Sequence, residues 1–276
     1  LLPTAPAADY ASAPYLLREW TISTELAASL VATAPMPREV GAVLALGRST
    51  FDGFTWNDAP LDPLSHVEAE VETIGTYGTA FQQATEAAFD SLAAGARVIH
   101  LASHAQAAPV QPLYSRIALG SGGGEDGTLH LYEILETPLA ADLVVLSGCE
   151  TGGGSVRGGE GVVGLEYGVR AAGAAAAVAT RWSVADRATA EIMGTFYEKL
   201  AAGLPKDEAL RQAQLIYLAS SEGLAASPFY WAAPVLSGSP APIPLDGRTN
   251  WWPLLIVVVT VTGGLTWRLK QTRPDA

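Results

Sequence analysis

Apolar runs of strand length alternate with amphipathic segments along most of this chain. The runs occupy residues 40–46, 97–103, 142–148, 175–180 and 229–236. In the segments between them, apolar residues recur every three or four positions, the period of a helix packed on one side; these segments are 66–75, 84–94, 161–172, 186–200 and 205–218, with a short helix or turn at 131–135. Strands that are apolar throughout are buried on both faces, as in a parallel sheet covered by helices. The pattern therefore predicts an α/β fold with a mostly parallel central sheet.

The pattern changes after residue 236, where a linker rich in Gly, Ser and Pro (237–248) precedes an uncharged run at 249–267. A helix of this length would span roughly 28 Å, close to the hydrocarbon thickness of a bilayer. Tryptophans bracket the run and basic residues follow it, as at the ends of membrane helices; they are Trp251, Trp252, Trp267, Arg268, Lys270 and Arg273. A buried core helix is the alternative, but little chain remains there for it to pack against. We predict a single C-terminal transmembrane helix.

The chain thus divides into a folded part at 1–236, the linker, the membrane helix and a short basic tail at 268–276. The basic residues after the helix outnumber Arg248, the single one in the twenty residues before it. The positive-inside rule then places the tail in the cytoplasm and the folded part outside it. The chain starts at Leu1 without a basic or apolar leader, so we expect a fragment or a processed form.

Composition and charge exclude several classes of protein. With 49% hydrophobic and 16% charged residues the chain is not disordered. A net charge of −12 argues against nucleic-acid binding. Cys149 is the single cysteine, which excludes an internal disulfide and a cysteine-rich zinc site, and no HExxH spacing is present. We therefore expect no metal and no cofactor. Arginine outnumbers lysine 13 to 3 in an alanine-rich chain, which is typical of a high-GC bacterium.

Two of the expected strands end in residues that can carry out nucleophilic chemistry. His104 lies just beyond the strand at 97–103, and Cys149 lies just beyond the strand at 142–148. Ligands of open α/β sheets bind outside the carboxyl ends of the strands. The separation of 45 residues is close to the roughly 50 residues between histidine and cysteine in caspases. A thiolate is a strong nucleophile and an adjacent imidazole can take its proton, so the pair fits a Cys–His dyad for acyl transfer.

Each member of the pair also has a structural interpretation. A lone cysteine is more often a small buried apolar residue, and a lone histidine is more often a hydrogen-bonded one. His100 competes as the base, but it lies inside its strand and is interpreted as buried and hydrogen-bonded. His66 opens a helix and His130 follows a glycine-rich loop, and neither is assigned a role.

Glycine-rich segments do not indicate a nucleotide site. Gly122, Gly124 and Gly127 fit GxGxxG by count, but Glu125 and Asp126 within it would repel a pyrophosphate. The run at 151–161 lacks the Lys-Ser/Thr of a P-loop. We interpret it as a loop beside Cys149 that shapes a substrate cleft.

Six blocks between residues 84 and 238 resemble, in order and spacing, the CHAT domain, the caspase-like domain often joined to TPR repeats. They are ATEAAFDSLAAGARVIHLASHA, LVVLSGCETGGG, GGEGVVGLEYGVRAAGA, ATRWSVADRATAEIMGTFYEKLAAG, KDEALRQAQL and SPFYWAAPVLSG. Upstream, YLLREWTISTELAASL, VGAVLALG and HVEAEVETIG resemble the family's earlier strands and the helix before the dyad, so the resemblance covers roughly residues 14 to 238. The chain then begins partway into the domain, and an upstream strand and any TPR partner precede it.

The resemblance implies a caspase/separase-like fold of cysteine proteases, a three-layer α/β/α sandwich. It implies His104 as general base and Cys149 as nucleophile, with the oxyanion held by the backbone N–H groups of Ala105 and Cys149. The family usually has glycine after the histidine, so Ala105 costs energy if this position needs a positive φ. Gly148 stands where the family usually has alanine, which we expect to be harmless.

Five polar or aromatic residues match recurrent positions of the family: Glu150, Glu160, Arg181, Trp182 and Asp186. Each is interpreted either as structural, by capping a helix, anchoring a loop or packing, or as a wall of the substrate pocket. Asp186 also fits the first turn of its helix, where the helix dipole stabilises an acid.

Two classes of function follow. The first is a membrane-tethered cysteine endopeptidase that hydrolyses peptide bonds of a protein or peptide substrate, activated by a partner or by a sensor region upstream. The second is a catalytically inactive scaffold of the same fold that binds peptides or partner proteins in signalling. An unrelated flavodoxin-like ligand binder would leave the six blocks unexplained.

Overall fold

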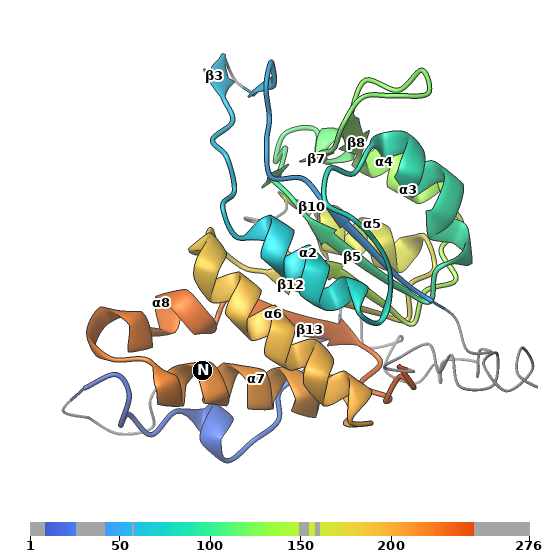
Figure 1. Ribbon diagram of the computed structural model, residues 1–276. Coiled ribbons are helices and arrows are strands. Elements are labelled where there is room, and N and C mark those ends of the chain that lie inside the picture. The colour runs from blue at the N-terminus through green and yellow to red at the C-terminus, as the bar shows by residue number, and fades with distance from the viewer. Residues whose placement is uncertain (1–8, 26–41, 57, 149–154, 158–160, 246–276) are drawn as a thin grey trace, which may run out of the picture. The chain divides into compact units, whose positions relative to one another are not determined.

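The computed structural model describes residues 9–25, 42–56, 58–148, 155–157 and 161–245 (Figure 1). Leu1–Leu245 form one compact unit. The predicted membrane helix at 249–267 and three candidate site residues, Cys149, Glu150 and Glu160, lie outside the described residues. Within the described ranges, no helix combines the length and the hydropathy that a bilayer crossing requires.

A six-stranded sheet in the order β13-β12-β9-β5-β1-β4 forms the centre of this unit. Its strands are β1 (Val43–Gly47), β4 (Gly78–Phe81), β5 (Val98–Ala102), β9 (Leu143–Leu146), β12 (Ala176–Thr180) and β13 (Pro234–Gly238). Neighbouring strands are parallel except for β12 and β13, which are antiparallel. The predicted α/β fold with a mostly parallel sheet is confirmed.

Helices cover both faces of this sheet because its central strands are apolar on both sides. One set of alternate strand residues packs against α2 (Val67–Gly75), α6 (Asp186–Ala201) and α7 (Lys206–Ser220). The opposite set packs against α3 (Glu86–Leu92), α4 (Leu131–Glu136) and α5 (Leu165–Ala171). Figure 1 shows the two groups of helices on either side of the strands. Each fully buried aliphatic or aromatic side chain contributes about 1.5–3 kcal/mol, so the two apolar layers hold the sandwich together.

Short elements complete the unit, and the sequence pattern did not predict them. They are the three-stranded sheet β6 (Ala105–Gln106), β7 (Arg116–Ala118) and β8 (Thr128–His130), the pairs β2 (Thr55–Trp56) with β3 (Ala59–Pro60) and β10 (Ser155–Arg157) with β11 (Gly161–Val163), and the 3-10 turns η1 (Leu16–Arg18), η2 (Ala93–Gly95), η3 (Pro112–Tyr114) and η4 (Gly223–Ala226). Strands of two or three residues are too short for alternation to be detected.

Two predicted elements were wrong in part. The helix expected at 161–172 begins only at Leu165, because Gly161–Val163 pairs with β10 as a strand. The strand expected at 229–236 is divided between a short helix, α8 (Pro228–Trp231), and β13. Pro228 at the first turn and the Ser227 hydroxyl, which accepts the N–H of Phe229, start that helix.

The C-terminal end of the unit extends past the last strand. Ile243 and Leu245 are buried, and the N–H and the ammonium of Lys206 donate to the carbonyls of Pro240 and Ala241. The compact unit therefore continues into the range that was predicted as linker.

The path of the chain reverses direction at β1. From β1 it moves outward to β4, and then it returns to β5 on the other side of β1 before continuing to β9 and β12. Loops diverge at such a switch point and leave a crevice at the carboxyl ends of the strands, where α/β proteins bind their ligands. The segments that follow β1 and β5 meet at this place.

Glu86 is a buried carboxyl in the first turn of α3. It accepts the N–H of Gly127 at 2.8 Å, in a turn where Gly127 has a φ of 90°. Burial raises the pKa of Glu86 to about 7, against the partial opposing effect of that hydrogen bond. The carboxylates of Glu133, Asp126 and Glu125 raise it further.

Substituting Glu86 should change how stability depends on pH. The folded-state pKa lies above the ordinary value of 4.5, so the stability contributed by protonated Glu86 is complete below pH 4.5 and is lost as pH rises through about 7. Glu86→Gln keeps the acceptor and cannot ionise. We expect it to match the wild type near pH 4.5 and to exceed it by about 1–3 kcal/mol at pH 8 in urea unfolding. Glu136→Gln, at an exposed carboxyl of α4, is the control. An equal difference at both pH values would contradict the prediction.

Candidate active site at the carboxyl ends of the strands

His104 lies two residues beyond the end of β5, at the switch point. Its Nε2 is 2.7 Å from the backbone oxygen of Asp62, and its ring centroid is 4.7 Å from that of Phe51. A carbonyl oxygen can only accept, so Nε2 carries the proton, and in the neutral imidazole Nδ1 is left as the basic nitrogen. The structure therefore gives His104 a defined tautomer as well as a fixed place.

The segment after β1 holds this carbonyl in position. Phe51 and Trp56 form a small apolar cluster with Ala118, and Phe54, Leu61 and Leu64 pack against it. Leu64 N donates to the Ser49 carbonyl at 2.9 Å, which closes the segment back onto the end of β1. The Arg116 guanidinium lies 4.7 Å from the Trp56 ring and adds a cation–π contact. Sequence reasoning missed this segment because its role is carried by a backbone carbonyl.

Ala105 begins β6 directly after His104. Among the described residues other than glycine, a positive φ occurs at Asp58 alone, so Ala105 bears no such strain. The His104 carbonyl accepts the N–H of Ala118 at 2.9 Å. Hydrogen-bonded positions alternate along an antiparallel pair, so the N–H of Ala105 points away from β7. Alanine at position 105 therefore adopts the required backbone conformation without strain, and its N–H remains available.

The end of β9 is held beside the end of β5. Ser147 N donates to the carbonyl of Leu101 at 2.8 Å, and its hydroxyl donates to Oε1 of Glu70 at 2.5 Å. The carbonyl of Gly148 accepts the hydroxyl of Thr180, at the end of β12. The last two residues before Cys149 in the chain are thus fixed by three hydrogen bonds.

Asp186 joins the starts of two helices near this edge. It is the first residue of α6, as predicted, and its Oδ2 accepts the N–H of His66, the cap of α2, at 2.7 Å. Burial raises the pKa of Asp186, while the hydrogen bond from His66 and the charges of His66 and His104 lower it. The Glu70 carboxylate raises it as well. The Asp186 carboxylate therefore attaches the start of α6 to the start of α2.

Arg181 and Trp182 have structural partners at the end of β12. The Arg181 guanidinium donates to both carboxylate oxygens of Glu166, at 2.6 and 3.1 Å, in the first turn of α5. Trp182 Nε1 donates to the carbonyl of Phe229 at 2.8 Å, in α8. These contacts attach α5 and α8 to β12, which favours the anchoring interpretation of both residues over the pocket-wall interpretation.

From the predicted set, the structure places Ala105 directly after His104 and Asp186 at the joined starts of α2 and α6, and Ser147 and Gly148 follow the neighbouring strand β9. Glu70, Ser147 and Thr180 were missed by sequence reasoning. One signal could have found two of them: Ser147 and Thr180 fall on the same alternating positions as the apolar residues that face α2 and α6.

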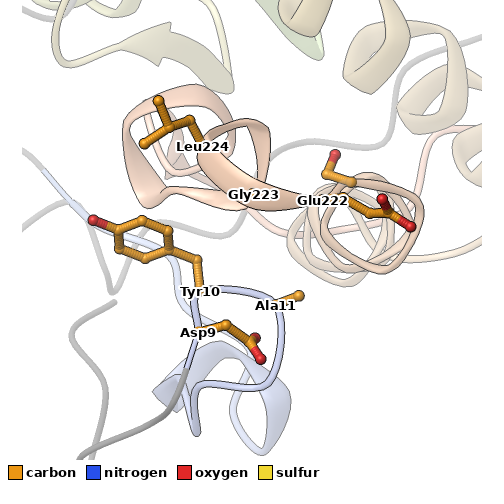
Figure 2. Close-up of a pocket in the computed structure, with 7 residues that line it drawn as sticks. Asp9, Tyr10, Ala11, Glu222, Gly223 and Leu224 are labelled. Atoms are coloured by element: carbon orange, nitrogen blue, oxygen red, sulfur yellow. The ribbon is translucent and has the colours of Figure 1, made fainter.

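A hollow in the surface lies outside this site. A hollow of about 580 Å³ is lined by the N-terminal segment and the turn after α7, with Tyr10 and Leu224 on its two sides (Figure 2). Its lining includes no residue of the strand ends.

In the part of the chain that the structure describes, no three His, Cys, Asp or Glu side chains converge as a metal site would require.

Fold and site together define a three-layer α/β protein with a histidine presented at the carboxyl edge of its sheet. The family model of the CHAT domain matches residues 1–239, and the chain therefore belongs to the CHAT domain family. This confirms the resemblance inferred from the six sequence blocks. A search of curated proteins found no match.

Two solved structures show how far the likeness extends. The separase–securin complex of Saccharomyces cerevisiae is 15% identical over 72% of this chain and 12% of that chain, with a TM-score of 0.46. The complex of Porphyromonas gingivalis RgpB pro- and mature domains is 9% identical over 74% of this chain and 48% of that chain, with a TM-score of 0.43. The chain spans only these parts of the two proteins, and likenesses at this level carry no argument about function.

A double-mutant cycle distinguishes anchoring from substrate contact at Arg181. Arg181→Met leaves the Glu166 carboxylate, which is 5% exposed, without its cation. We expect a loss of about 2 kcal/mol in the free energy of unfolding, and partial recovery when Glu166→Gln is added. Urea unfolding measures both. The exposed pair of Arg187 and Glu191 is the matched control, where Arg187→Met should change the free energy of unfolding far less than Arg181→Met does. Equal losses at the two arginines would contradict the anchoring role.

Proposed function

We propose that this chain is a cysteine endopeptidase of the CHAT family in which His104 is the general base and Cys149 the nucleophile. The observation that carries the proposal is the register of two neighbouring strands. β5 and β9 are parallel, and each paired residue of β9 is numbered 45 above its partner, from Val98 with Leu143 to Leu101 with Leu146.

The same offset relates the two proposed catalytic residues. His104 and Cys149 are separated by the same 45 residues, so each follows the last paired residue of its strand, Leu101 or Leu146, by three positions. The two residues therefore come from the ends of neighbouring parallel strands. The free Nδ1 of His104 supports the base role, since Nε2 is occupied by the Asp62 carbonyl.

The proposed reaction uses these groups in two stages. Nδ1 of His104 takes the proton of the Cys149 thiol, and the thiolate attacks the carbonyl carbon of a peptide bond. The imidazolium then gives its proton to the leaving amine as the C–N bond breaks, which leaves a thioester on Cys149. Water, deprotonated by the same imidazole, hydrolyses the thioester and releases the acid. No metal or cofactor takes part.

Backbone donors would stabilise the oxyanion of each tetrahedral intermediate. The proposed donors are the N–H groups of Ala105 and Cys149, and the orientation of the Ala105 N–H away from β7 supports the first. Glu150, Glu160 and Asp186 remain candidates for the substrate pocket. Activation by a protein partner or an upstream sensor region, such as TPR repeats, completes the proposal.

The proposal also includes attachment to a membrane through residues 249–267. Their hydropathy and the basic residues that follow support a single helix with the peptidase domain outside the cytoplasm. The compact unit that ends at Leu245 would then be joined to the helix by a short segment.

The catalytic proposal is tested by alkylation of Cys149 with iodoacetamide across pH. Cys149 is the only cysteine, so the rate reports on this thiol alone. An isolated thiol titrates near about 8.5, and an imidazolium partner lowers that midpoint. We expect the wild-type midpoint well below 8.5, and we expect His104→Ala to return it to about 8.5 and to slow peptide hydrolysis by about 10²–10⁴-fold.

A second histidine provides the control for this experiment. His130 lies at the start of α4, outside the site, so His130→Gln should leave the midpoint unchanged. A midpoint near 8.5 in the wild type that His104→Ala does not move would reject the dyad and favour the scaffold function.

The membrane proposal has its own test. Full-length chain should sediment with membranes and resist carbonate extraction, whereas residues 1–245 should stay in the supernatant. The pair Val257→Asp and Val259→Asp should also release the chain, because each carboxylate at a helix centre opposes insertion by about 2.5–3.5 kcal/mol. Protease added outside intact spheroplasts should digest the main domain. Protection of that domain would reverse the orientation, and solubility of the full chain would reject the anchor.

A further inference from the structure

A buried polar chain runs from the core to the end of β9. Tyr197 of α6 and His100 of β5 are both 0% exposed, and Glu70 of α2 is 3% exposed. The Tyr197 hydroxyl is 3.3 Å from Nδ1 of His100, and Nε2 of His100 is 2.9 Å from Oε1 of Glu70. The hydroxyl of Ser147 donates to the same carboxylate oxygen at 2.5 Å. Four side chains, two from one helical layer and two from the sheet and its edge, are thus joined in series.

The proton positions along this chain are consistent with one another. Oε1 of Glu70 accepts from Ser147, and as a carboxylate oxygen it also accepts the N–H of His100 at Nε2. Nδ1 of His100 is then the acceptor of the Tyr197 hydroxyl. Burial raises the pKa of Tyr197 well above its ordinary value, and the Glu70 charge raises it further, so the hydroxyl keeps its proton. The Glu70 charge also raises the pKa of the Asp186 carboxyl.

Such a chain is not explained by stability. Apolar residues of similar volume commonly stabilise a core as well as, or better than, a buried charged group with its partners. The residues around it are apolar, including Val98, Val145 and Val178 on the same face of the sheet. The polar chain instead provides a directional hydrogen bond to Ser147, at the partly exposed end of β9.

We propose that Glu70 is a positioning residue for the nucleophile: oriented by His100 and Tyr197, it holds Ser147 and so sets where the chain leaves β9. Thr180 holds the next residue, Gly148, from the β12 side. Cys149 follows in the chain, so the hydrogen bonds of Ser147 and Gly148 fix the two residues that precede the proposed nucleophile. The inference rests on the proposed peptidase function and adds the residues that place Cys149 relative to His104.

Substitutions of Ser147 in the full-length chain test this role, with iodoacetamide as the probe. Ser147→Ala removes the hydroxyl at the partly exposed end of the chain, so the fold should survive. We expect the alkylation midpoint of Cys149 to rise toward about 8.5 and the rate at pH 7 to fall about tenfold, because a small displacement separates thiolate and imidazolium. Ser147→Thr retains a hydroxyl and should keep the wild-type midpoint.

Gln214→Leu is the control, since it removes buried hydrogen bonds from α7 to the carbonyls of Trp231 and Pro234, outside the polar chain. It should lower the Tm at least as much as Ser147→Ala does and leave the midpoint unchanged. If the midpoints follow the Tm in both variants, the chain is merely structural and the inference is overturned.

His104→Ala separates this inference from the function on which it rests. If His104→Ala moves the midpoint and Ser147→Ala does not, the dyad stands and the positioning role is overturned. If neither variant moves it, the dyad is absent and both proposals are overturned.

Discussion

Burial of both faces of the central sheet is the constraint on which the rest of this molecule depends. Strands enclosed between two helical layers must be apolar along their length, so polar chemistry is restricted to their ends. The reversal of the chain at β1 then places the segments that follow β1 and β5 side by side at the carboxyl edge of the sheet. His104 occupies that place, and the parallel pairing of β5 with β9 brings Ser147 and Gly148 alongside.

The same constraint makes the buried pair of His100 and Glu70 unusual, because both polar side chains lie within an apolar layer. His100 occupies a strand position that alternation assigns to the core, and Glu70 comes from the helix that covers it. A carboxyl at that depth can persist only if donors surround it. The donors to Glu70 are His100 of β5 and Ser147 just after β9, and Tyr197 of α6 donates in turn to His100, so α2, α6, β5 and β9 are linked through a few atoms.

Sequence patterns were sufficient for the parts of the fold that repeat. The buried strands and the long helices α6 and α7 follow from apolar periodicity, and His104 follows from its place after a strand. Patterns failed where a short strand is defined by its pairing partner, as β11 is by β10 and the limits of β13 are by β12. They also failed where a contact is made by backbone atoms, as at Asp62, or between a helix and the sheet, as at Glu70, since neither leaves a periodic signal.

The contact between His104 and the Asp62 carbonyl has a consequence for how this protein tolerates mutation. Every amino acid carries a carbonyl, so the group that orients the imidazole survives any replacement at position 62. Replacing Asp62 with alanine would keep the carbonyl that His104 contacts. The position of this carbonyl depends on the path of the chain after β1, which the packing of Phe51, Trp56 and Leu64 determines. Selection for an oriented histidine would therefore fall on apolar residues that never touch a substrate, and their loss would be misread as a defect of folding.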